Sequence, residues 1–359
     1  MLRRTLDSLT RSADTAWDRL QDWRVNPNPI ASIAINKRPL HLPWGGGNQW
    51  LNQIVRFLRA TGYSVQFQLG PRVDCILIAD PKRSSTTTFG LEDIQAHRHH
   101  YPNVVCIHRI NDNDQHRDAG RDVLQAKAHA LADYTIFISN WVREYYAARW
   151  FDPAKPHTVI LNGADASVFH SSGGLEWTPG SPLRLVTHHW SNNWNKGFAV
   201  YQEIDRLIAA GRLPETELWV IGRWPDTIQW KAAKTFGPTT GAQLTCLLRN
   251  CHVYVTASRW EAGGMHVIEG VQCGLPLLYH LDGGGIVEVA RQVGIGFHDD
   301  IHAAILTVRA RYAELRQAAL HHAYSGEQMC CEYQRVIEHA LGLKRTRRRG
   351  VALSVTPDQ

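Results

Sequence analysis

The sequence predicts an α/β protein built from two doubly wound domains that face each other across a cleft. Short apolar runs rich in β-branched residues recur along the chain, and each is followed by a stretch with helical character. This alternation is typical of buried parallel strands joined by helices. The pattern restarts after a segment rich in Gly, Ser and Pro at residues 171–182, and 359 residues are enough for two domains.

The first half of the chain contains six of the predicted strands. They are expected at residues 30–35, 64–68, 75–79, 104–108, 135–139 and 158–161. Helices are expected between them, at residues 48–61, 117–132 and 140–150. Because these strands are apolar throughout, helices should cover both faces of their sheet.

The second half repeats the plan, with strands expected at residues 183–187, 217–221, 253–257 and 276–279. The prediction divides the chain into an N-terminal amphipathic helix, a first Rossmann-like domain, a linker, a second domain, and a helix end with a basic tail. These parts cover residues 1–28, 29–170, 171–182, 183–335 and 336–359.

Both ends of the chain leave alternatives open. At the N-terminus, Leu6, Leu9, Ala13, Trp17, Leu20 and Trp23 lie at helical spacing. Such a helix either packs against the first domain or attaches to a membrane surface. At the C-terminus, Lys344, Arg345 and the three arginines 347–349 supply most of the net charge of +6. This tail either contacts anionic membrane lipid or is only solvated.

Composition excludes several classes of protein. With 44% apolar and 20% charged residues, the bulk of the chain is not disordered, and no apolar window is long enough to span a membrane. The seven cysteines show no C-x-x-C spacing, so we expect neither a disulfide framework nor a zinc site. Without the five tail cations the charges nearly balance, so no nucleic-acid partner is expected. We expect a cytoplasmic protein, with peripheral contact at the inner face of the membrane as the alternative.

Three loops at the ends of predicted strands have the composition of ligand sites. Residues 45–47 are three glycines before a helix, which allow close approach of a ligand to the backbone. Lys196 and Gly197 follow the strand at 183–187, at the start of another helix. Glu261 and Glu269 flank a Gly-Gly turn after the strand at 253–257. A phosphate suits the helix starts, and carboxylates accept hydrogen bonds from sugar hydroxyls.

The segment 253–288, with Glu261 and Glu269 in E-x7-E spacing, resembles the donor-site signature of retaining glycosyltransferases of family 4. The N-G-A-D sequence at 162–165 is similar to the interdomain turn of that family, and I-S-N-W at 138–141 to a motif of its first domain. The resemblance covers about residues 30–335. It implies a GT-B fold, in which two Rossmann-like domains bind a nucleotide sugar mainly through the second domain and an acceptor mainly through the first.

Carried over by position, the resemblance assigns roles to single residues. Lys196 would contact the diphosphate, Glu261 would hold the transferred sugar, and Glu269 would hold the ribose. His108, at the end of a first-domain strand, would face the donor sugar, or would be structural. The remaining donor-binding residues would be Gly46, Gly47, Ser191, Arg223, Gly264, Met265 and His266.

The sequence also departs from the family pattern. An arginine that often precedes the lysine is absent, so either Arg223 or polar side chains such as Ser191 would make the second phosphate contact. Asp112 and Asp114 imitate a D-x-D metal motif, but in the first domain of a GT-B protein they are expected to be structural or on the acceptor side. No metal and no cofactor are expected, since the nucleotide sugar is a substrate.

The prediction is a retaining, metal-independent hexosyltransferase-type enzyme that moves a sugar from a nucleoside diphosphate to an acceptor hydroxyl. The acceptor would be a growing glycan or a small hydroxyl compound, in glycan or glycoconjugate biosynthesis. Two alternatives stand beside it. One is an enzyme of the same fold that does not transfer the sugar, such as a hydrolase, phosphorylase or epimerase. The other is a nucleotide-sugar-binding sensor.

Overall fold

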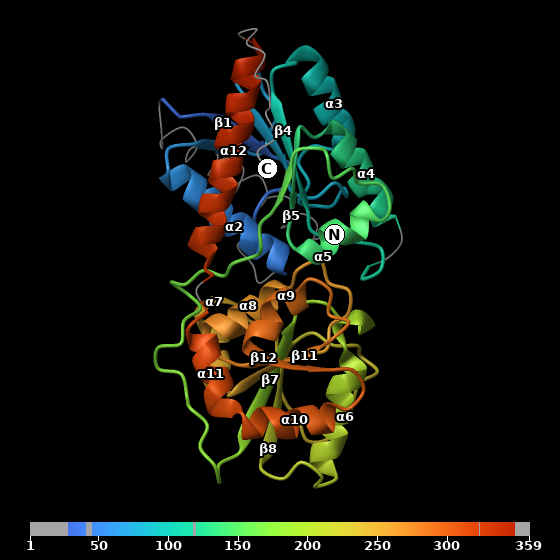
Figure 1. Ribbon diagram of the computed structural model, residues 1–359, viewed down its shortest axis with the longest axis vertical. Coiled ribbons are helices and arrows are strands. Elements are labelled where there is room, and N and C mark those ends of the chain that lie inside the picture. Colours follow the sequence, from blue (N-terminus) through green and yellow to red (C-terminus); the bar gives the residue numbers. More distant parts are fainter. Residues whose placement is uncertain (1–27, 41–44, 118–119, 323, 349–359) are drawn as a thin grey trace, which may run out of the picture.

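The structure is a computed structural model that describes residues 28–40, 45–117, 120–322 and 324–348. The predicted N-terminal helix, apart from its last residue, and the tail beyond residue 348 lie outside the described residues. The described part forms two α/β lobes, drawn one above the other in Figure 1. Among the described helices none has the length and apolar character needed to cross a membrane.

The first lobe contains a parallel sheet with strand order β2-β1-β3-β4-β5-β6. Its strands are β1 (Ser32–Ile35), β2 (Ser64–Gln66), β3 (Cys75–Ile78), β4 (Val105–Ile110), β5 (Tyr134–Phe137) and β6 (His157–Val159). Its helices are α2 (Gly46–Ala60), α3 (Leu91–His100), α4 (Arg121–Leu131), α5 (Asn140–Ala147) and the last helix of the chain, α12 (Gly326–Arg348). The chain reverses its direction of travel across the sheet between β1 and β3.

The second lobe contains a parallel sheet with strand order β12-β11-β10-β7-β8-β9. Its strands are β7 (Leu183–His189), β8 (Thr216–Gly222), β9 (Lys234–Phe236), β10 (Val253–Thr256), β11 (Leu277–His280) and β12 (Gly294–Phe297). A 3-10 turn, η1 (Trp194–Lys196), precedes the helices α6 (Phe198–Ala209), α7 (Gly241–Arg249), α8 (Met265–Gln272), α9 (Ile286–Val293), α10 (Ile301–Ala310) and α11 (Tyr312–Leu320). The reversal point here lies between β7 and β10.

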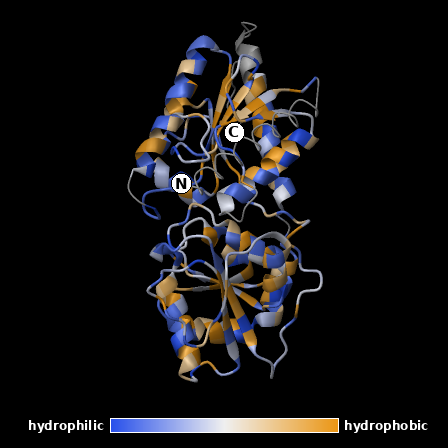
Figure 2. Cartoon of the chain, turned by 180° about the vertical axis from the view of Figure 1, so that it is seen from behind, coloured by the Kyte–Doolittle hydropathy of each residue, from blue (hydrophilic) through white to orange (hydrophobic). Residues whose placement is uncertain are grey.

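The two doubly wound sheets confirm the predicted fold class. Each of the ten predicted strands coincides with an observed one. The two that the sequence did not reveal are β9, which is largely exposed, and β12, in which two glycines weaken the apolar pattern. Figure 2 shows apolar strands at the centre of each lobe and hydrophilic colour on the outer helices, as expected for sheets covered on both faces.

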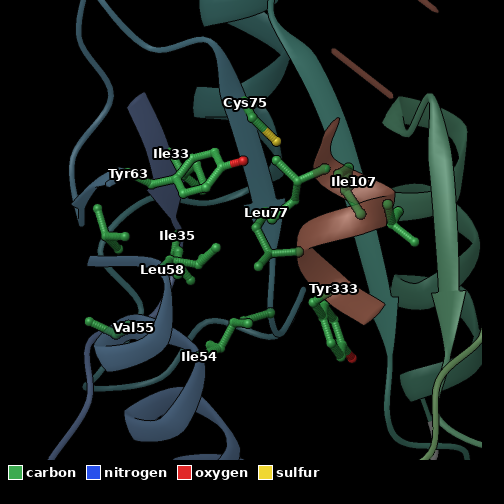
Figure 3. Close-up of a cluster of buried hydrophobic side chains, with 14 of the residues drawn as sticks. Ile33, Ile35, Ile54, Val55, Leu58, Tyr63, Cys75, Leu77, Ile107 and Tyr333 are labelled. Carbon is green, nitrogen blue, oxygen red and sulfur yellow. The ribbon is translucent and has the colours of Figure 1, made fainter. Parts of the chain in front are cut away.

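Helix α12 follows the second lobe in sequence but packs on the first. Met329, Tyr333 and Ile337 are completely buried in one cluster with Ile33, Leu77 and Ile107 of the first sheet. Figure 3 shows Tyr333 beside Leu77 and Ile107. The predicted boundary between residues 335 and 336 therefore falls inside a continuous helix that belongs to the core of the first lobe.

Candidate active site

A cleft of about 410 Å³ lies between the lobes, at the carboxyl ends of both sheets. The reversal points of both sheets open onto it, which is where doubly wound sheets bind ligands. We call the lining residues numbered 37–162 the first wall, because they come from the first lobe. We call the lining residues numbered 188–269 the second wall, because they come from the second.

Lys196 reaches the cleft from the short turn that follows β7. The side chain of Asn193 caps this turn by accepting a hydrogen bond from the Asn195 N–H, at 2.9 Å. Gly197 follows with φ +88°, and a Cβ there would lie 2.3 Å from the Cβ of Ala257, so only glycine fits. Close packing on β10 thus fixes the backbone on which Lys196 stands.

The loop after β10 holds Glu261 by backbone pairing with the loop after β11. The Trp260 N–H donates to the Asp282 carbonyl at 2.8 Å, and the Gly285 N–H donates to the Glu261 carbonyl at 2.8 Å. Trp260 has φ +56°, which is uncommon for a residue with a side chain. Local strain of this kind is often found at functional sites.

Lys196 and Glu261 form an ion pair that is nearly buried in the second wall. Burial by itself raises the pKa of the Glu261 carboxyl, but the Lys196 ammonium outweighs this effect and holds that pKa well below its usual range. The Glu261 carboxyl is therefore ionised at neutral pH. The pair gives the second wall one positive and one negative charge in direct contact.

Glu269 projects from α8 and is 3% exposed. One of its carboxylate oxygens lies 2.8 Å from Nε2 of His188, and Nδ1 of His188 lies 3.0 Å from the Tyr254 hydroxyl. The Tyr254 hydroxyl can donate to Nδ1 while Nε2–H donates to Glu269. This chain fixes one carboxylate oxygen, and Glu269 also lines the cleft.

The start of α8 meets the start of α2 across the cleft. A Cβ on Gly46 would lie 2.6 Å from Cβ of Met265, so the two helices approach as closely as a glycine allows. Met265, His266, Gly46 and Gly47 all line the cleft. Burial lowers the pKa of His266 to about 3, so this imidazole is neutral. Two helix N-termini, whose backbone dipoles favour anions, therefore point at the same space.

His116, which the sequence analysis did not select, reaches the site from the loop after β4. Its Nδ1 lies 2.7 Å from the Arg259 carbonyl oxygen and must donate to it, while Nε2 lies 4.0 Å from Glu261. Burial lowers the pKa of His116 to about 4. Nε2 is buried and has no hydrogen-bond partner among the described residues. The ring thus presents a neutral acceptor to the cleft.

Three predicted site residues do not line the cleft. His108 is completely buried within β4, where burial lowers its pKa to about 3, and its side chain does not reach the cleft in which a donor sugar is expected. Arg223 is exposed and reaches only the Trp190 carbonyl, at 3.4 Å. Gly264 forms the N-cap of α8 but is not among the lining residues. The other predicted residues, Lys196, Ser191, Glu261, Met265, His266, Glu269, Gly46 and Gly47, are brought together there.

Asp112 and Asp114 have protein partners. Asp112 pairs with Arg117 and Arg121, each at 3.5 Å, and burial raises its pKa. Asp114 accepts backbone N–H groups at the start of α4, including that of Gly120 at 3.1 Å. Asp114 therefore acts as a cap of α4, and only Asp112 of the two lines the cleft.

A cluster of His280, Asp282 and His298 has the spacing of a metal site within the described part of the chain. However, the Arg259 guanidinium lies 2.9 Å from His280 Nε2, and the Asp282 N–H donates to His280 Nδ1 at 3.0 Å. A cation would meet an arginine and an occupied ring nitrogen there. The donor set does not fit a metal.

The first wall is strongly cationic. Its positive side chains are Lys37, Arg38, Lys82, Arg83, Arg109, Arg117 and Arg121, and its carboxylates are Asp80 and Asp112. The sequence analysis selected none of these cations, because five are spread over the loops after three strands, Arg109 lies within β4, and Arg121 begins α4. The signal available in the sequence was only that each loop directly follows a buried strand.

Comparisons with known proteins agree with this geometry. Residues 204–306 match the family Glycosyl transferases group 1. No curated protein matches the chain. Among solved structures, sucrose-phosphate synthase from Thermosynechococcus elongatus is similar with a TM-score of 0.57 and 16% identity, over 90% of this chain and 98% of that one.

Two further structures show the same likeness. A glycosyltransferase from Rickettsia africae has a TM-score of 0.60 and 14% identity, over 88% of this chain and 99% of that one. HepE from Anabaena, solved in complex with UDP, has a TM-score of 0.62 and 12% identity, over 86% and 100%. The chain therefore has the GT-B fold of these glycosyltransferases, and its second half carries the signature of the glycosyl transferases group 1 family.

Proposed function

We propose that this protein is a retaining glycosyltransferase that moves a sugar from a nucleoside-diphosphate-sugar donor to an acceptor hydroxyl. One observation carries the proposal. The Lys196–Glu261 pair, Glu269 and the start of α8 line one wall of a cleft, and the glycines at the start of α2 line the opposite wall. The family match over residues 204–306 covers Glu261, Met265 and Glu269.

The second wall suits a donor of this kind. Lys196 and the start of α8 would contact the diphosphate, because an ammonium and a helix N-terminus both stabilise phosphate charge. Glu269 would accept hydrogen bonds from the ribose, and its bond to His188 would keep the carboxylate in place. Glu261 would hold hydroxyls of the transferred sugar, since it lies beside Lys196. A solved relative of the same fold, HepE, carries UDP, which makes UDP the first donor base to test.

In the transfer step, the bond between the anomeric carbon and the diphosphate oxygen breaks, and a bond to the acceptor oxygen forms. The leaving diphosphate gains negative charge, which Lys196 would offset, and it would take the acceptor proton on the same face of the sugar. His116 would accept a hydrogen bond from a sugar hydroxyl through Nε2, the role that the resemblance assigned to His108. No metal ion enters this scheme.

The experiment that tests the proposal begins with a thermal-shift screen of UDP, GDP and ADP. Ligand at ~100 times its dissociation constant adds ~2.7 kcal/mol to the free energy of unfolding, which is readily seen. Glu269→Ala should remove the shift, whereas the exposed Glu144→Ala should keep it. If none of the three diphosphates raises the melting temperature of the parent, the proposal fails.

Product analysis with the diphosphate sugar then tests the reaction. NMR of the anomeric proton should show the same configuration in product and donor, and inversion would overturn the retaining mechanism. Free sugar released at the same rate with and without acceptor would identify a hydrolase. Donor binding without turnover over a broad acceptor panel would identify a sensor.

A further inference from the structure

We propose that the acceptor is an anionic compound, a sugar or other hydroxyl compound carrying a phosphate or a carboxylate, and that the cationic first wall binds its charged group. This proposal rests on the proposed glycosyl transfer and adds to it the chemical class of the acceptor. The argument starts from how charge is divided between the two walls.

The cations of the first wall gather at one end of one sheet. Lys37 and Arg38 follow β1, Lys82 and Arg83 follow β3, and Arg117 follows β4. These three strands are neighbours in the order β1-β3-β4, so their carboxyl ends lie side by side. The loops therefore form one continuous positive surface on the acceptor side of the cleft. The second wall holds a single lysine, paired with Glu261.

The carboxylates of the first wall do not balance its cations. Asp80 pairs with Lys37 at 2.9 Å and with Arg121 at 3.6 Å, and Asp112 is shared by Arg117 and Arg121. Outside the cleft, Arg83 also contacts Asp93 at 3.1 Å. Two carboxylates, Asp80 and Asp112, thus serve three cations inside the cleft. Lys82 and Arg109 form no ion pair with a described carboxylate, and this excess of positive charge attracts an anion.

Arg109 is a second and independent indication of an anionic ligand. Its side chain is 2% exposed yet lines the cleft. Nε donates to the Tyr333 hydroxyl and Nη2 to Asn162, each at 3.0 Å, and the guanidinium lies over the Trp50 ring. Nη1 is buried and has no hydrogen-bond partner among the described residues. None of its described partners is a carboxylate. A buried charge without a carboxylate in direct contact is costly, and an anion in the cleft would offset that cost.

The loop after β3 adds the polar groups that usually accompany a bound anion. Ser84, Ser85 and Thr86 line the cleft directly after Lys82 and Arg83. The Ser84 hydroxyl lies 3.1 Å from that of Thr86 and 3.0 Å from that of Thr87, so these groups already form a small network. Hydroxyls and arginine or lysine side chains together match the oxygens of phosphate and carboxylate groups.

Calorimetry with matched sugars tests the proposal. Glucose 6-phosphate, glucuronate and glucose are titrated into the protein, first alone and then with a saturating nucleoside diphosphate. Both charged sugars, or one of them, should bind at least about tenfold more tightly than glucose, and added salt should weaken only the charged ones. The first two arms distinguish a phosphate acceptor from a carboxylate acceptor. Equal binding of glucose and the charged sugars, or no binding of either charged sugar, would overturn the proposal.

The variant Lys82→Ala/Arg117→Ala locates the site. It should lower affinity for the charged sugar about tenfold and leave that for the nucleoside diphosphate unchanged. The control is Lys127→Ala/Lys155→Ala, which removes two exposed lysines of the same lobe outside the cleft and should change neither affinity. If the double variant melts at a lower temperature, Lys82→Gln on the exposed loop replaces it.

The outcomes separate this proposal from the proposed function. An equal loss of diphosphate affinity in the Lys82 variant would show that these cations hold the donor, and the acceptor proposal would be wrong. If no nucleoside diphosphate binds while a charged sugar does, glycosyl transfer fails but the anion site stands.

Discussion

The two walls of the cleft occupy equivalent places in their sheets, but they would stabilise a bound anion with different groups. In the second wall, between β7 and β10, the one lysine is paired with Glu261 and His266 is neutral, so an anion would depend on Lys196 and on backbone dipoles at the start of α8. In the first wall, between β1 and β3, side-chain cations outnumber carboxylates, and several of them are exposed. Backbone dipoles are fixed by the fold, whereas exposed cations are screened by salt.

The difference teaches that one cleft can bind two different anions, the donor diphosphate on the second wall and a charged acceptor on the first. A nearly neutral wall favours a ligand that fits the helix terminus and carries hydroxyls for the two glutamates. A positively charged wall selects mainly by charge. Substitutions in either wall test this division of roles.

The largest effect is expected from Lys196→Ala, which removes the only cation of the second wall. If Lys196 offsets the charge on the departing diphosphate, turnover should fall ~10²–10³-fold, as on removal of one transition-state partner. The measurement is kcat with a nucleotide-sugar donor that the parent protein uses. The exposed Lys231→Ala is the control and should match the parent. Turnover close to that of the parent would show that the first wall supplies the phosphate contact.

Lys196→Ala also leaves Glu261 buried without its partner, which lowers stability. The variant Lys196→Ala/Glu261→Gln removes both charges and serves to separate folding from chemistry. It should recover the melting temperature, and its turnover should stay below that of Glu261→Gln alone. Turnover equal to that of Glu261→Gln would mean that Lys196 is only structural.

A smaller effect should separate the two glutamates of the second wall. Glu269→Ala should weaken binding of the free nucleoside diphosphate and of the full donor, because a hydrogen bond to a charged group contributes ~1.5–3 kcal/mol. Glu261→Ala should weaken only the donor, since Glu261 would contact the sugar. Calorimetry with both ligands is the test. Equal losses in both variants would reject the separate roles.

Acid should destabilise the protein through its buried neutral histidines, and His116 offers a way to measure one of them. Burial lowers its pKa to about 4, below the unfolded value of ~6.5. The contribution to stability is therefore complete above pH ~6.5 and is lost as the pH falls toward ~4, because the unfolded chain binds the proton first. His116→Asn should reduce the slope of unfolding free energy against pH in this window by up to ~1.4 kcal/mol per pH unit. Urea titrations at several pH values measure it, and parallel curves would contradict it.

No effect at all is expected from chelation. The phosphate contacts proposed here come from Lys196 and a helix N-terminus, while Asp112 is engaged by two arginines and Asp114 by backbone N–H groups. Turnover in EDTA should equal turnover without it. Loss of activity that Mg²⁺ or Mn²⁺ restores would show that the carboxylates of the first wall bind a metal.

Local sequence pattern located most of the polar side chains of the second wall and none of the cations of the first. Lys196, Glu261 and Glu269 lie in short loops directly after strands, so their spacing alone brings them to one edge of a sheet. His108 does not line the cleft because alternate residues of a strand point to opposite faces: its ring is buried within the lobe, while the next residue, Arg109, reaches the cleft. His116 lies in the loop that follows this strand, and no local pattern distinguishes it.

The fold shows the same limit. The apolar composition of buried strands makes them predictable from sequence, and every predicted strand is present in the structure. The place of α12 depends on contacts of Tyr333 with Trp50 and Arg109, more than 200 residues earlier in the chain. Such long-range packing leaves no trace in a window of neighbouring residues.

The return of α12 also sets the order in which the lobes can mature on the ribosome. The core of the first lobe includes Ile33, Leu77 and Ile107 from early in the chain, and Met329 and Tyr333 from near its end. At ribosomal speeds the segment between Ile107 and Met329 takes roughly 11–44 s to be synthesised. During that time the apolar face of the first sheet is not yet covered by α12, while the second lobe can already fold. The first lobe to be synthesised is thus the last to be completed, and its nascent form is a natural client for chaperones that shield exposed apolar surface.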